Sequence, residues 1–194
     1  MLPFLHDRLQ KLQQLLERSN AVFVKYNQLD LDLALALTGF LDEAISLYRA
    51  LNRASAENEL LALKAQFVSA EHGTHPLTLE RITSHRREMM RSIALRVLQQ
   101  SALQLRTDYE QVTQTLNEAR IQLRPIVLLA MQKGLISQSQ RKQISQHQLD
   151  ELWRSLLKEP DIILAARQVA MQISLFDIQL LLSELITAAR QTKA

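Results

Sequence analysis

The longest uninterrupted helical pattern in the chain spans residues 78 to 124. Neither Gly nor Pro, the residues that most often end helices, occurs between Thr78 and Arg124. Apolar residues recur there at alternating spacings of four and three, the pattern of a heptad seam that faces a partner helix. The seam consists of Leu98, Ala102, Leu105, Tyr109, Val112, Leu116, Ala119 and Leu123. The sequence therefore predicts one helix of about 70 Å. Pro125 kinks this helix or restarts it, and Lys133 and Gly134 then close the pattern.

The rest of the chain has the same helical signature. Only 3 Gly and 4 Pro occur in 194 residues, so turns are few and helices are long. The stretch LDLDLALAL at residues 29–37 alternates like a strand, but it contains no β-branched or aromatic residue and is predicted to be helical. We expect Asn27 and Asp30 to mark the start of this second helix and Ser55 to cap the third.

These patterns predict an all-α fold: an elongated antiparallel helical bundle with coiled-coil-like heptad packing and one long central helix, at about 78–124. Residues 1–194 are expected to form a single all-helical unit. The alternative is a subdivision into N-terminal helices (1–97) and C-terminal helices (98–194) that share the long helix.

Two capping signatures of the form S-x-x-Q predict helix starts at Ser137 and Ser145. A last helix is expected to open at Pro160 and Asp161 and to be apolar over a wide arc, which indicates a bundle centre or an oligomer interface. Asp177 interrupts this arc. A buried carboxylate there needs a partner, and Arg or Lys of another helix could supply it.

The stretch EHGTHP, residues 71–76, places a glutamate and two histidines within five positions. Zinc sites need three or four converging ligands, and no fourth ligand lies nearby in the sequence. Gly73 instead fits the left-handed position that ends a helix, and Pro76 fits the start of a new one. We therefore interpret the stretch as a turn, and we expect no metal and no cofactor.

The best anion-binding candidates are Arg86, Arg87 and Arg91, which lie on or beside one helix face. Such residues contact phosphates, but a solvated helix face is the more ordinary explanation, and no aromatic residue lies in the stretch to stack on bases. With a net charge of +3, nucleic-acid binding is open but unsupported. It is the alternative to the leading hypothesis.

The leading hypothesis is a non-enzymatic interaction or assembly protein, such as an adaptor, scaffold or regulatory subunit. A seam this regular is suited to meeting helices, and the long helix lacks enough partners in its own chain. A second copy of the chain, or another helical protein, could supply them. No Gly-rich phosphate loop or nucleophile motif is present. No apolar run reaches the length of a membrane span, and the expected location is the cytoplasm.

Overall fold

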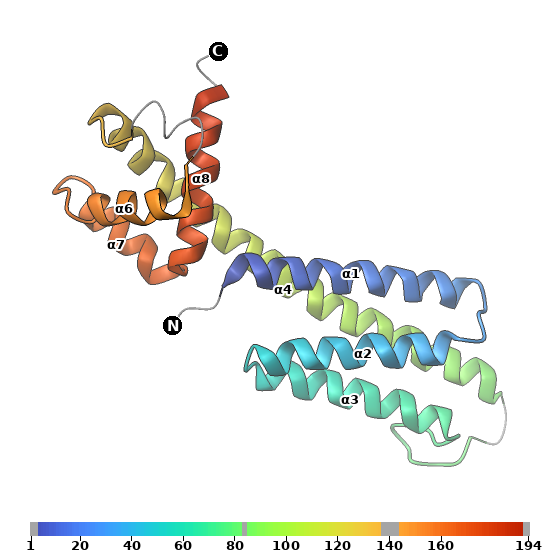
Figure 1. Ribbon diagram of the computed structural model, residues 1–194. Coiled ribbons are helices and arrows are strands. Elements are labelled where there is room, and N and C mark those ends of the chain that lie inside the picture. Colours follow the sequence, from blue (N-terminus) through green and yellow to red (C-terminus); the bar gives the residue numbers. More distant parts are fainter. Residues whose placement is uncertain (1–3, 83–84, 137–143, 192–194) are drawn as a thin grey trace. The chain divides into compact units, whose positions relative to one another are not determined.

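The computed structural model describes residues 4–82, 85–136 and 144–191. These residues form an all-α fold with no named β-strand (Figure 1), which confirms the predicted fold class. The helices are α1 (Leu5–Asn27), α2 (Leu33–Ala50), α3 (Ala54–Glu71), α4 (Arg86–Gln132), α6 (Gln146–Leu156), α7 (Ile163–Gln172) and α8 (Leu175–Gln191). None of the described helices combines the length and the apolar character needed to cross a membrane.

Contacts between residues group the chain into two compact units. The first comprises residues 10–110, and the second comprises residues 1–9 together with residues 111–194. Helix α4 contributes its first part to one unit and its last part to the other. The predicted single unit of residues 1–194 and its alternative subdivision between residues 97 and 98 both stay predictions.

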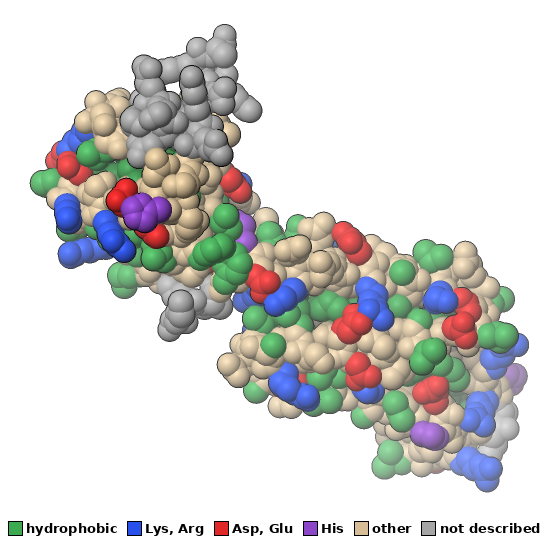
Figure 2. All heavy atoms as spheres, in the orientation of Figure 1, with side chains coloured by type: hydrophobic (Ala, Val, Ile, Leu, Met, Phe, Trp, Pro, Cys, Tyr) green, Lys and Arg blue, Asp and Glu red, His purple; other side chains and the backbone are tan. Residues whose placement is uncertain are grey.

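The unit of residues 10–110 contains α2, α3, most of α1 and the first half of α4, and α2 packs against α3. Its fully buried side chains come from all four helices and include Leu12, Leu37, Phe40, Leu60, Phe67, Val97 and Leu105. Acidic and basic side chains are interspersed over the face of α1–α3 that Figure 2 shows, so this face has no patch of a single sign.

The second unit packs α8 against α6 and α7, and the last part of α4 belongs to the same unit. Its core is aliphatic apart from one tryptophan and includes Leu123, Ala130, Ile136, Trp153, Leu156, Val169, Leu181 and Leu182. The start of α6 is the predicted one, because Ser145 and Gln148 form a reciprocal capping box.

The long helix exists, but its predicted bounds of about 78–124 are wrong at both ends. It begins at Arg86, because residues 73–82 are held in a hydrogen-bonded turn. In that turn the His75 N–H donates to the Glu80 carbonyl at 2.8 Å, and the Ile82 N–H donates to the Gly73 carbonyl at 2.8 Å. The helix ends at Gln132 and passes through Pro125.

An interior proline costs a helix roughly 3 kcal/mol. Helix α4 continues past Pro125 because the apolar register continues, and Ile126, Val127 and Ala130 are all buried. The predicted seam is likewise buried or half-buried from Leu98 to Leu123. Knobs-into-holes packing of this seam stays a prediction.

The predicted last helix is two helices. The chain is extended at Ile173, where ψ is 161°, and Ser174 then caps α8 by accepting a hydrogen bond from the Asp177 N–H at 3.2 Å. This S-x-x-D signature was present in the sequence and was missed. The break also leaves part of the apolar arc on the surface, since Met171 is 80% exposed.

Two predicted caps are confirmed by backbone geometry: Gly73 has φ +79° and Gly134 has φ +73°, each just after a helix. Two other predicted starts are wrong. Helix α2 begins at Leu33 rather than near Asn27, and α3 begins at Ala54, before the expected cap at Ser55. The signature at residues 137–140 lies outside the described residues.

Candidate functional site

An apolar groove lies between the last part of α4 and the last turns of α8, both within one unit. Its volume is about 820 Å³, within the range of small ligand pockets. We call it the α4–α8 groove. It is lined by Arg120, Ile121, Arg124, Val127, Leu128, Met131, Gln132, Leu185, Ala188 and Ala189.

The groove follows from the side chains that the two helices present. Ile121 and Leu128 lie seven residues apart, and so on nearly the same side of α4, away from the buried seam. They are 72% and 50% exposed. On α8, Ala188 and Ala189 are too small to fill the space beside them. Large aliphatic residues on one helix and small ones on the other therefore leave an apolar groove.

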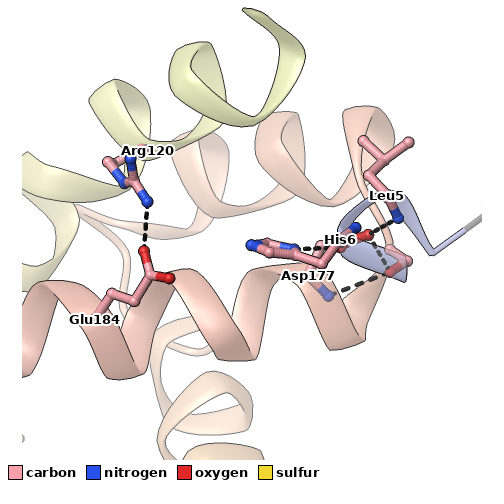
Figure 3. A network of polar contacts seen from close by, with 6 residues as sticks. Leu5, His6, Arg120, Asp177 and Glu184 are labelled. Carbon is pink, nitrogen blue, oxygen red and sulfur yellow. Dashed lines mark hydrogen bonds and ion pairs between the residues drawn. The ribbon is translucent and has the colours of Figure 1, made fainter. Parts of the chain in front are cut away.

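The polar side chains of the groove come mainly from α4. Arg120 pairs with Glu184 of α8, as Figure 3 shows, and both side chains are about half exposed. An exposed pair of this kind contributes at most about 1 kcal/mol. Arg124 is also exposed and lies one helical turn further along α4. The groove thus combines an apolar lining with basic charge.

The opposite end of α8 is held by Asp177, whose side chain is fully buried. Figure 3 shows this carboxylate beside the first residues of α1. It accepts hydrogen bonds from the Leu5 and His6 N–H groups, each at 3.0 Å. It also contacts His6 Nδ1 at 2.6 Å and accepts from the Ser174 hydroxyl at 2.6 Å. The expected Arg or Lys partner is therefore replaced by a helix N-terminus.

Burial by itself raises the pKa of Asp177, because it disfavours the charged carboxylate. The hydrogen bonds from the Leu5 N–H, the Ser174 hydroxyl and His6 act in the opposite direction and are stronger together, so the pKa lies below its ordinary value. The carboxylate also sits in the first turn of α8 and at the start of α1, where helix dipoles favour negative charge. Asp177 is thus a charged cap shared by two helices.

The three predicted anion-binding arginines are adjacent in the structure but are used differently. Arg86 donates to the Glu71 carbonyl at 2.5 Å, and Arg91 donates to the Tyr26 carbonyl at 3.2 Å and lies 4.9 Å from the centre of that tyrosine ring. Both arginines therefore satisfy carbonyls at helix C-termini, where cations are favourable. Arg87 is exposed. Anion binding stays a prediction.

The EHGTHP stretch forms the predicted turn. His75 Nδ1 accepts from the N–H groups of Leu77 at 3.3 Å and Thr78 at 3.1 Å, so this imidazole stabilises the loop itself. Over the described part of the chain, no cluster of three or more His, Asp or Glu side chains has the arrangement of metal ligands.

The sequence interpretation missed the groove residues because Ile121 and Leu128 lie outside the heptad seam. A usable signal was present: both are large aliphatic residues at a spacing of seven on the otherwise polar face of the helix. Comparison with protein-family models, curated proteins and solved structures found no match.

Proposed function

We propose that the chain is a non-enzymatic interaction or assembly protein, of the adaptor, scaffold or regulatory-subunit type, that holds a helix of another polypeptide in the α4–α8 groove. The exposed apolar lining supports this proposal most directly. Burying an aliphatic side chain is worth about 1.5–3 kcal/mol, so covering Ile121 and Leu128 favours association. An amphipathic helix laid in a hydrophobic groove is a common mode of recognition.

The first candidate partner is a second copy of the chain, and another helical protein is the alternative. Self-association needs no further component, and homo-oligomers are the commonest assemblies of soluble proteins. The proposed setting is the cytoplasm, which a cysteine-free composition permits.

Sedimentation velocity over a wide range of protein concentrations tests the proposal. The unmodified chain is expected to associate as concentration rises, and Leu128→Glu, which places a charge in the groove, is expected to stay monomeric. The matched control is Leu103→Glu, a leucine of α4 that is 65% exposed and belongs to the other unit. A monomer at every concentration would refute self-association, and undiminished association of Leu128→Glu would refute the role of the groove.

The alternative proposal, a nucleic-acid or anion-binding regulator, uses Arg86, Arg87 and Arg91. It is the weaker one, since two of these arginines already donate to helix carbonyls. Electrostatic binding is strongest at low salt, so a gel-shift experiment with mixed DNA at low salt that shows no complex would remove it.

A further inference from the structure

We infer that the occupant of the α4–α8 groove is the beginning of α2 of a second copy of this chain. This inference rests on the proposed function and names the partner segment for the same groove. The segment consists of Leu31, Asp32 and Leu35, and we call it the α2 knob.

The α2 knob is the most exposed apolar segment near a helix start among the described residues. Leu31 is 91% exposed and Leu35 is 77% exposed. Leu29, just before them, is 53% exposed and has φ 60°, a conformation that is unfavourable for leucine. Three exposed leucines thus lie just before or in the first turn of a helix whose later apolar residues are buried. Exposed apolar residues grouped in this way mark a surface that another molecule covers.

Charge favours the α2 knob over the exposed apolar face of α7. Asp32 is exposed between the two knob leucines. The neighbouring Asp30 pairs with Lys25 at 2.7 Å, while Asp32 makes only a weaker electrostatic interaction with that lysine, so its carboxylate can accept a cation of the partner. The groove offers Arg124. The exposed face of α7, with Leu164 and Met171, is less suitable because Arg167 lies between them and would face the arginines of the groove.

The spacing of the apolar groups is also compatible. Ile121 and Leu128, seven residues apart on α4, are separated by about 10 Å along the helix axis. Leu31 lies in the turn just before α2 and Leu35 lies in the first turn of α2, so the two leucines are close neighbours along the chain. In the proposed complex both knob leucines contact the apolar lining between Ile121 and Leu128, and Asp32 pairs with Arg124.

The test uses complementary variants of the full chain. Leu31→Ser/Leu35→Ser disables the knob and Leu128→Glu disables the groove. We expect each variant alone to have a dissociation constant at least about tenfold higher than that of the unmodified chain, as the loss of one buried aliphatic side chain implies. Leu77→Ser/Leu79→Ser is the matched control, because these leucines are 66% and 77% exposed in the same unit, and it should associate normally.

Mixing the two disabled variants gives the decisive result. One retains an intact knob and the other an intact groove, so a one-to-one complex is expected in the mixture at concentrations at which each variant alone stays monomeric. A mixture that stays monomeric, or a knob variant that associates like the unmodified chain, would refute the α2 knob as the occupant. Loss of association in Leu128→Glu would still support the groove as a binding surface in that case. If the unmodified chain never associates, both the knob and the self-association proposal fail.

Charge reversal provides an independent readout. Asp32→Arg and Arg124→Asp should each weaken association, and the chain that carries both changes should recover it, because the oppositely charged pair is restored with its polarity exchanged. Recovery in the double variant is specific to direct contact. Two losses that simply add in the double variant would show that these two residues do not face each other.

Discussion

Replacing Asp177 tests the tertiary cap that joins α8 to the start of α1. In the Asp177→Ala variant the Leu5 and His6 N–H groups lose their acceptor, and no residue of their own helix can replace it, because the first N–H groups of a helix have no intrahelical partner. The Ser174 hydroxyl and His6 Nδ1 lose a partner as well.

The magnitude follows from the four interactions that the carboxylate makes. A hydrogen bond to a charged group contributes about 1.5–3 kcal/mol, and a buried donor left unsatisfied costs about 1–3 kcal/mol. These contributions are not additive. His6 is partly exposed, so water can hydrogen-bond to its imidazole in the variant. We expect Asp177→Ala to lower the free energy of unfolding by about 3–4 kcal/mol, a large part of the roughly 5–15 kcal/mol typical of a domain. Asp177→Asn keeps one acceptor oxygen and should cost about 2 kcal/mol.

The effect should depend on pH in a defined direction. The pKa of Asp177 in the folded chain lies below its ordinary value of 3.8. The carboxylate therefore stabilises the fold fully at pH values above 3.8, and this contribution is lost as the pH falls through the lower folded pKa. The difference in stability between the unmodified chain and Asp177→Asn should thus be constant near neutral pH and shrink in strong acid.

Urea unfolding followed by circular dichroism measures these differences, provided that the m-value is unchanged. Glu80→Gln is the control, since Glu80 is exposed; it should change stability by less than about 0.5 kcal/mol. A loss below about 1 kcal/mol in Asp177→Ala at neutral pH would refute the shared cap, because it would mean that water replaces the carboxylate at little cost.

Three further outcomes test local features, all measured as changes in the free energy of unfolding. Gly73→Ala and Gly134→Ala should each cost about 1–2 kcal/mol because both positions have positive φ. The first should cost more, since its added methyl would lie 3.3 Å from an arginine guanidinium carbon; equal losses would contradict that contact. Leu29→Gly should stabilise by roughly 0.5–1 kcal/mol, as its φ of 60° suits glycine, and a loss would show that its side chain packs. Arg91→Gln should cost about 1 kcal/mol, whereas the exposed Arg87→Gln should be neutral; equal effects would argue against a structural role for Arg91.

The helical class and the buried face of α4 could be predicted because both depend on local periodicity. A spacing of four and three places Leu105, Val112 and Leu123 on one side of any α-helix, and these three are buried. The helix ends at Gly73 and Gly134 were also predictable from local sequence, because few residues other than glycine adopt positive φ at low cost. The start at Arg86 and the uninterrupted passage through Pro125 were missed, since a hydrogen-bonded turn and the packing beyond Pro125 outweighed local propensity.

The sequence by itself determined that this protein is helical, which stripes are buried and where several helices end, because each of these depends on residues a few positions apart. Only the tertiary structure decided the partner of Asp177, which lies 172 residues away at the N–H of Leu5. It also decided that Ile121 and Leu128 line a groove with α8. The physical reason is that a hydrogen-bond acceptor or an apolar face can be recognised in a single segment, whereas the group that meets it depends on how distant segments pack.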